Sequence, residues 1–172
     1  NGLDNNAPFY GKKTTLHEGG LRTPLLIKWP EETISGQVFS DVVSIADIYP
    51  TLLESIGLTP PDNLDGSSVY QSIQLVEPPP QKALFWDFYP ENYGALSADG
   101  RWRLHQLYRV WGALPPPNLY DLFLDSTGTQ PVLPTPPLKL AELQEDYQAW
   151  YRDVHTVATT YSENANGSGV LT

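Results

Sequence analysis

The chain has 172 residues, of which 40% are hydrophobic and 17% charged, a composition typical of a globular domain rather than a disordered segment. Twenty acidic residues against ten basic ones give a net charge of −10, which argues against nucleic acid as the main partner, because phosphate binding needs clustered Lys and Arg. The lack of Cys excludes disulfides and thiolate metal sites, and no apolar run approaches the roughly 20 residues of a membrane span.

The first half of the chain alternates loops with short elements. Residues 1–24 are rich in Gly, Asn and Thr and predict a long loop. The apolar run 25–29, bounded by prolines, predicts a buried strand. Apolar residues at helical spacing predict a helix over residues 45–56, with Asp47 as its cap, and a second short helix over residues 67–74.

A run of three prolines at 78–80 predicts a boundary between two subdomains, residues 1–77 and residues 78–172. The second should be an antiparallel sheet of about four strands, since turn signals such as Asp99-Gly100 separate alternating segments. A helix near 138–155 should pack on this sheet. The strands are expected over residues 83–89, 93–98, 102–108 and 118–122.

The most informative stretch is the polar loop before residue 25. Up to residue 30 the chain carries a net charge of +2, although the whole chain is acidic. This suits a small anionic substrate, although a chance excess of two charges gives the same count. Lys13 can place a compact positive charge against an anion, and Lys12 is the alternative by proximity. Both can also be solvated surface lysines.

The segment from Gly11 to Pro30 resembles the sulfatase family signature, roughly G-x-K-x-[ST]-L-[YH]-E-G-G-[ILV]-R-x-P-L-[IL]-[IV]-x-W-P. Residues 47–53, 64–68, 100–104 and 118–122 are similar to later motifs of the same family. The positions that fit the signature are Gly11, Lys13, Thr15, Leu16, Glu18, Gly19, Gly20, Arg22, Pro24, Leu25, Trp29 and Pro30.

This resemblance implies an α/β fold of the alkaline-phosphatase-like superfamily, of which the chain would be the C-terminal part. Such enzymes hydrolyse sulfate esters with a formylglycine made from Cys or Ser in a C/S-x-P-x-R motif, beside a bound Ca²⁺. No such motif occurs here, and the chain has no Met and begins at Asn1. We therefore expect a fragment, inactive alone, whose nucleophile and other metal ligands lie upstream.

The resemblance also implies roles for individual residues. Lys13 would contact the substrate sulfate, which makes it the catalytic and substrate-binding candidate. Asn1 matches the end of the family's Asp-Asn-Gly motif and would be a calcium ligand. His17 and His105 are further substrate-binding candidates, and Glu18 is expected to form a structural ion pair with Arg22.

The expected partners are a sulfated small molecule or saccharide and the remainder of a sulfatase domain. Self-association through the exposed 25–29 segment is a further expectation. By family resemblance, the protein should be periplasmic, secreted or lysosomal. Two alternatives remain open: a phosphonate or phosphate monoester hydrolase of the same superfamily, and a non-catalytic interaction fragment.

Overall fold

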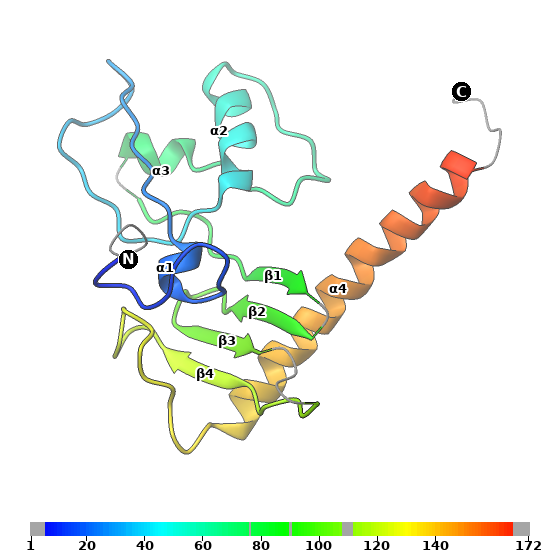
Figure 1. Cartoon of the computed structure of the whole chain (residues 1–172). Helices are drawn as coiled ribbons and strands as arrows, with labels where there is room; N and C mark the ends of the chain where they lie inside the picture. Colours follow the sequence, from blue (N-terminus) through cyan, green and yellow to red (C-terminus); the bar gives the residue numbers. More distant parts are fainter. Residues whose placement is uncertain (1–5, 76, 90, 108–111, 167–172) are drawn as a thin grey trace. The chain divides into compact units, whose positions relative to one another are not determined.

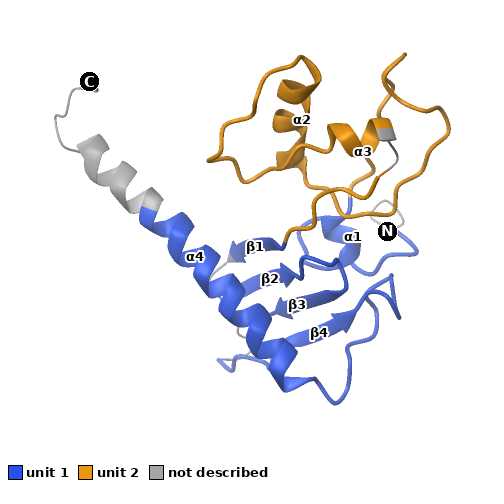
Figure 2. Ribbon diagram, turned by 180° about the vertical axis from the view of Figure 1, so that it is seen from behind, with its two compact units in different colours: residues 1–22, 83–172 blue, residues 23–82 orange. Residues whose placement is uncertain are grey.

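The computed structural model describes residues 6–75, 77–89, 91–107 and 112–166. The chain divides into two compact units, unit 1 with residues 1–22 and 83–172 and unit 2 with residues 23–82 (Figure 2). This division lies close to the predicted boundary at 77/78, but it assigns the first 22 residues to the C-terminal unit. The prediction that residues 1–77 complete a larger α/β domain stays a prediction.

Unit 1 is built on an antiparallel sheet whose strands follow one another in chain order (Figure 1). Its strands confirm the four predicted segments: β1 (Leu84–Tyr89), β2 (Asn92–Leu96), β3 (Trp102–Gln106) and β4 (Asn118–Asp121). The Asp-Gly turn joins β2 to β3, and Gly100 adopts the positive φ of 71° that this turn requires.

The long helix α4 (Pro137–Asn166) covers one face of this sheet (Figures 1 and 2). Leu143 and Tyr147 of the helix are buried against Ala95, Leu104 and Leu119 of the strands, and together they form the main core. The predicted helix near 138–155 is confirmed, although it continues to Asn166. No described helix, α4 included, combines the length and apolarity needed to cross a membrane.

The opposite face of the sheet is also buried. Successive side chains of a strand point to opposite faces, so Leu96, Arg103 and Tyr120 lie on the face away from α4. Leu16 also belongs here, because its Cδ1 lies 3.9 Å from the point where a Cβ would stand on Gly94 of β2. The loop that carries the signature therefore packs on the sheet.

Unit 2 contains the helical elements η2 (Ile45–Asp47), α2 (Ile48–Ser55) and α3 (Tyr70–Leu75). The predicted helix over 45–56 is confirmed, but its first turn is capped by Ser44, and the predicted cap Asp47 is the third helical residue of that capping box. The Ser44 amide donates to Asp47 Oδ2 at 2.7 Å, and the Ala46 amide donates to Ser44 Oγ at 3.3 Å. This reciprocal arrangement satisfies amides that the first helical turn leaves without partners.

The buried Asp47 also holds the chain before α3. Its Oδ1 accepts the Ser67 amide at 2.7 Å and forms an ion pair with Lys82. Gly66 fits this turn because a Cβ there would stand 2.0 Å from the Ala46 carbonyl oxygen. These tertiary bonds engage the backbone at Ser67, so α3 begins at Tyr70 rather than at the predicted residue 67.

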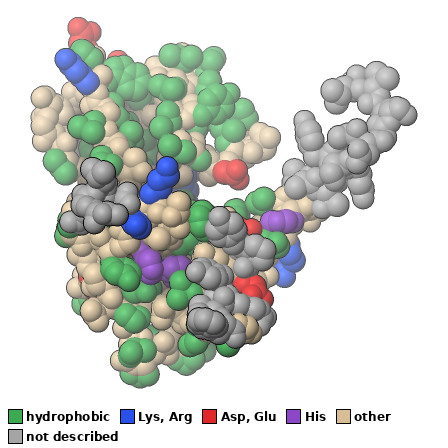
Figure 3. Space-filling view, in the orientation of Figure 1, with side chains coloured by type: hydrophobic (Ala, Val, Ile, Leu, Met, Phe, Trp, Pro, Cys, Tyr) green, Lys and Arg blue, Asp and Glu red, His purple; other side chains and the backbone are tan. Residues whose placement is uncertain are grey.

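The prediction of a strand over residues 25–29 is wrong for this structure, whereas the expected exposure of this apolar segment is confirmed. Leu26 is 89% exposed and Leu25 51% exposed, and the segment has no strand pairing. Within the described part of unit 2, no strand offers this segment a hydrogen-bonding neighbour. Hydrophobic side chains spread over the surface of residues 23–82 as a result (Figure 3).

Candidate functional site

The candidate site is built by the loop of residues 6–22, which unit 1 holds against its own sheet. The Tyr10 amide donates to the Thr127 carbonyl at 3.1 Å, and the Gly19 amide donates to the Tyr10 carbonyl at 2.8 Å. The Asn6 side chain donates to the Gly19 carbonyl. These bonds join the two ends of the loop to each other and fix its backbone conformation, although its sequence is rich in Gly.

Two glycines allow the loop to fold this tightly. A Cβ on Gly19 would stand 2.4 Å from the Gly11 carbonyl oxygen, and a Cβ on Gly20 would stand 2.1 Å from the Thr15 carbonyl oxygen. Both distances are too short for any side chain, so the Gly-Gly pair is needed for close backbone approach at the helical turn α1 (Glu18–Leu21).

Lys13 lies at the exposed tip of a tight turn in this loop. The Thr15 amide donates to the Lys12 carbonyl at 3.1 Å, and Thr15 Oγ1 donates to the same oxygen at 2.7 Å. Thr14 has a φ of 72°, a conformation that costs a non-glycine residue energy and is held by its surroundings. The turn therefore presents the Lys13 ammonium to solvent from a fixed backbone.

Glu18 joins the loop to the sheet through two arginines. Its carboxylate pairs with Arg22 Nε at 2.5 Å, which confirms the predicted ion pair. Its Oε1 also lies 3.1 Å from Nε of Arg103 on β3. Arg103 is 1% exposed, its Nη1 donates to the Leu16 carbonyl, and its guanidinium stands 5.0 Å above the Tyr120 ring. Arg103 therefore holds the loop against the sheet.

The two candidate histidines, one from the loop and one from β3, contact each other. The ring centroids of Tyr10 and His17 lie 4.6 Å apart, and those of His17 and His105 also lie 4.6 Å apart, both pairs edge to face. His105 is 2% exposed, whereas His17 is half-buried. His105 is therefore closed off from solvent behind the loop, and His17 is the more accessible of the two.

Both histidines are neutral at physiological pH. Burial, assisted by the positive charge of Arg103, lowers the pKa of His105 from 6.5 to about 3 and that of His17 to about 4. Among the described residues, neither His105 ring nitrogen has a hydrogen-bond partner. Protonating either ring would place a second positive charge near Arg103 in a poorly solvated region.

This arrangement predicts a specific loss of stability in acid. Because both histidines bind protons more readily in the unfolded chain, the free energy of unfolding should fall as the pH drops from 6.5 toward 4. The slope should be about 1.4 kcal/mol per pH unit for each histidine that stays neutral when folded. Urea denaturation of wild type and His105→Leu at several pH values measures it.

The variant should lose one of the two histidine contributions and therefore show a shallower pH dependence. His155→Gln on the exposed side of α4 is the matched control. Equal slopes for wild type and His105→Leu would show that His105 is accessible to protons in the folded protein.

The predicted metal ligand Asn1 lies outside the described residues. Among the residues that the structure describes, no group of three or more His, Cys, Asp or Glu side chains could hold a metal ion. The calcium and the role of Asn1 as its ligand therefore stay predictions.

Arg103 is a component of the site that was not predicted from the sequence. Its signal was present, because Arg103 stands at the basic position of the G-x-W-K-L-like segment from Gly100 to Leu104. Nothing in that local pattern says that its guanidinium reaches a carboxylate 85 positions earlier in the chain, so only the folded structure connects it to Glu18.

The chain matches one family model over residues 7–136, that of the N-sulphoglucosamine sulphohydrolase C-terminal domain. N-acetylgalactosamine-6-sulfatase of Homo sapiens is 40% identical over 70 residues, which are 40% of this chain and 13% of that protein. Arylsulfatase K of Mus musculus is 32% identical over 123 residues, which are 66% of this chain and 22% of that protein. The chain thus spans less than a quarter of each of these relatives.

Two solved structures share the fold at low sequence identity. The crystal structure of Ps i-CgsB superposes with a TM-score of 0.73 at 23% identity, over 85% of this chain and 32% of that one. A second structure, described in connection with the metabolism of multiple glycosaminoglycans by Bacteroides thetaiotaomicron, superposes with a TM-score of 0.64 at 18% identity. It covers 82% of this chain and 31% of that one.

Proposed function

Because the chain belongs to the N-sulphoglucosamine sulphohydrolase C-terminal family, we propose that it is the C-terminal portion of a sulfatase that hydrolyses sulfate esters. The rest of such an enzyme would precede it, since the chain spans 13% of the human relative. The names of the relatives support a sulfated saccharide as substrate, and N-acetylgalactosamine-6-sulfatase is named for a sulfated amino sugar. A periplasmic, secreted or lysosomal location is part of the same proposal.

Within this proposal Lys13 binds the sulfate group. The observation that carries this role is its exposed position on a turn whose backbone is fixed by Thr15 and by the Gly19–Gly20 contacts. A fixed ammonium neutralises charge on the sulfate and on the leaving oxygen without reorganising during the reaction.

The two histidines take different roles in this proposal. His17 is half-buried at the loop and can line the substrate pocket, whereas His105 is sealed behind it and acts through the ring contact that orients His17. Since both rings are neutral, neither supplies positive charge to the sulfate, and the charge comes from the lysines of the loop, Lys13 by its place in the signature and Lys12 as the alternative.

The formylglycine nucleophile and Ca²⁺ belong to this proposal only through the family. A formylglycine hydrate would supply the attacking oxygen, and Ca²⁺ would stabilise negative charge beside it. The 172 residues contain no C/S-x-P-x-R motif. We therefore derive no step through either group, and we propose Asn1 as this chain's contribution to the metal.

The apolar surface of unit 2 supports the remainder of a sulfatase domain as its partner. A shallow cavity of about 140 Å³ lies between the 25–29 segment and α2, and its lining is almost entirely apolar. Leu25, Ile27 and Trp29 line one side of this cavity, and Ile48 and Leu52 line the other. An exposed apolar surface of this kind favours burial by another part of a protein, and self-association is the competing outcome.

A comparison of a sulfate ester with the phosphate ester of the same alcohol tests the proposed reaction. The protein in which this chain follows the rest of a sulfatase domain should hydrolyse p-nitrophenyl sulfate faster than p-nitrophenyl phosphate, and the 172 residues alone should hydrolyse neither. Preference for the phosphate would replace the proposal with a phosphate monoester hydrolase. Lack of turnover of both by the complete protein would favour an interaction module.

A further inference from the structure

A cavity of unit 1 lies on the α4 side of the sheet, on the face opposite the Lys13 loop. Its volume is about 580 Å³, which lies within the range of roughly 300–1,000 Å³ that is usual for small-molecule sites. Neither the sulfatase motifs nor the candidate site uses it. The cavity is lined by Asp87, Phe88, Glu91, Tyr93, Gln106, Leu114, Gln144, Tyr147, Gln148 and Tyr151.

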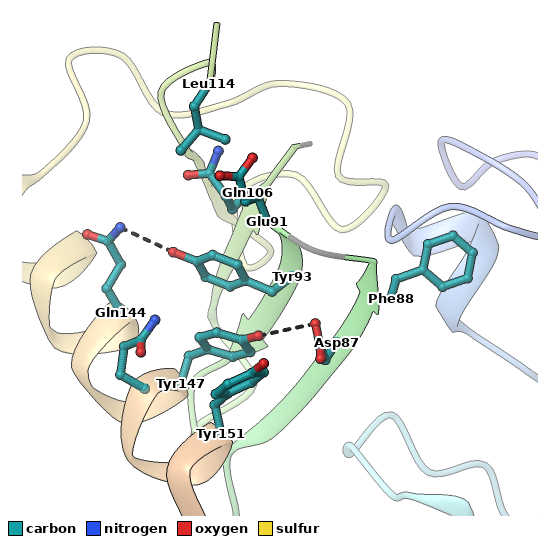
Figure 4. A pocket seen from close by; sticks show the side chains of 10 residues that line it. Asp87, Phe88, Glu91, Tyr93, Gln106, Leu114, Gln144, Tyr147 and Tyr151 are labelled. Carbon is teal, nitrogen blue, oxygen red and sulfur yellow. Dashed lines mark hydrogen bonds between the residues drawn. The ribbon is translucent and has the colours of Figure 1, made fainter. Parts of the chain in front are cut away.

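Aromatic rings form one wall of this cavity (Figure 4). Tyr93 of β2 and Tyr147 of α4 are stacked with centroids 4.0 Å apart and an interplanar angle of 10°. Tyr151 lies 5.8 Å from Tyr147 with its ring tilted by 40°, and His155, which is outside the cavity lining, stacks on Tyr151 at 3.7 Å. Tyr147 thus lies between Tyr93 and Tyr151, and Tyr93 ends the row.

Polar side chains surround the space beyond the Tyr93 ring, and an apolar side chain closes its far end. Figure 4 shows Leu114 pointing toward the Tyr93 ring, with Gln106 and Glu91 between them in this view, whereas Phe88 points away. Gln144 Nε2 donates to the Tyr93 hydroxyl at 3.3 Å, and the Tyr147 hydroxyl donates to Asp87 Oδ1 at 3.3 Å. Both bonds are long, so their groups can turn toward a ligand at small cost.

The lining groups distinguish between classes of ligand. The amides of Gln144 and Gln148 and three phenolic hydroxyls can both donate and accept hydrogen bonds, which matches the hydroxyl groups of a sugar. Gln106 offers only its Oε1 as an acceptor, because its Nε2 donates to the Leu107 and Pro115 carbonyls at 2.9 Å. Among the described residues that line the cavity there is no Lys, Arg or His, and Asp87 contributes an exposed carboxylate, so a sulfated or phosphorylated ring is repelled. An organic cation would need several open aromatic faces, and here stacking covers the inner rings.

We propose that this cavity is a saccharide-binding site for an uncharged sugar unit, which packs against Tyr93 and bonds its hydroxyls to Asp87 and the glutamine amides. The site is separate from the sulfate-binding loop, and it disfavours the sulfated units that the loop binds. A saccharide chain whose sulfate groups are spaced along it offers both kinds of unit. The proposal does not depend on turnover, because it concerns binding by unit 1 alone.

Nuclear magnetic resonance titration of the isotopically labelled protein tests this proposal. N-acetylglucosamine should shift the side-chain amide signals of Gln106, Gln144 and Gln148. N-acetylglucosamine 6-sulfate should bind at least about tenfold more weakly, since a carboxylate facing a sulfate at short range opposes binding by more than the 1.4 kcal/mol that a factor of ten represents. Tetramethylammonium should not compete with the neutral sugar.

Two variants of different kinds keep the test independent of folding. Asp87→Asn keeps an oxygen that can accept the hydrogen bond from the Tyr147 hydroxyl. It should weaken binding of the neutral sugar about tenfold. It should also reduce the difference in affinity between the neutral sugar and the sulfated sugar. Leu114→Trp fills the cavity from its exposed rim and should abolish binding of every sugar. Glu145→Gln is the matched control, on an exposed position of α4 outside the cavity.

Each other outcome overturns the proposal. These outcomes are shifted signals away from the cavity, tighter binding of the sulfated sugar, competition by tetramethylammonium, no binding at all, or unchanged binding in Leu114→Trp. Loss of sulfatase turnover in any of these variants would test the proposed reaction, and it would not test saccharide binding at this cavity.

Discussion

Glu18→Gln is expected to lower the free energy of unfolding of the C-terminal unit by about 3–5 kcal/mol, because it leaves the buried Arg103 guanidinium without a countercharge. Glu18 is 4% exposed and Arg103 1% exposed, so water cannot replace the lost partner. Burial already lowers the pKa of Arg103, and the Glu18 carboxylate opposes that shift. Denaturation in urea, followed by far-ultraviolet circular dichroism, measures the change.

The control is the exposed pair between Lys139 and Glu142 on α4, with an oxygen–nitrogen distance of 2.7 Å. Glu142→Gln should cost less than about 1 kcal/mol, since exposed pairs contribute little. The double variant Glu18→Gln with Arg103→Met removes both buried charges and should recover much of the loss. If Glu18→Gln costs no more than Glu142→Gln, the buried pair does not anchor the loop.

Local patterns were sufficient to predict most elements of the fold. The Asp99-Gly100 turn and the alternating segments around it predict β2 and β3 to within a few residues. The helical spacing over 45–56, with Asp47 as a cap, predicts η2 and α2. These features depend on residues near one another in sequence, and this is the range over which turn chemistry and periodicity carry information.

Features that depend on distant contacts were not predictable in the same way. The pattern of residues 25–29 indicates burial but does not say what buries them, and in this structure they are exposed. His17 and His105 were proposed separately, and their ring contact joins a loop to β3 across 88 positions of sequence. The anchoring of Glu18 by Arg103 is of the same kind.

The structure tests only some of the predictions made for the residues of the candidate site. The Glu18–Arg22 pair was predicted from the signature and is confirmed. The roles of Lys13 and His17 remain predictions, and Asn1 lies outside the described residues. The structure adds the reason why the loop can serve a site, which is that its glycine contacts and its buried anchor fix the backbone that carries Lys13.

Lys13→Ala is expected to lower kcat/KM for sulfate ester hydrolysis by about 100- to 1,000-fold, which is the usual effect of removing one group that stabilises developing negative charge. Two opposite charges about 4 Å apart interact by about 4 kcal/mol at an effective dielectric constant of about 20, and this is enough to account for such a loss. The fold should not change, because Lys13 is exposed and the turn is closed by backbone and Thr15 bonds.

The steady-state rate of p-nitrophenyl sulfate hydrolysis by the complete protein, compared among wild type, Lys13→Ala and Lys12→Ala, tests the central claim most directly. The account predicts the large loss for Lys13→Ala and only a few-fold change for Lys12→Ala, which removes the same charge one residue away. Equal effects of the two substitutions, or a larger effect of Lys12→Ala, would contradict the assignment of Lys13 as the sulfate contact.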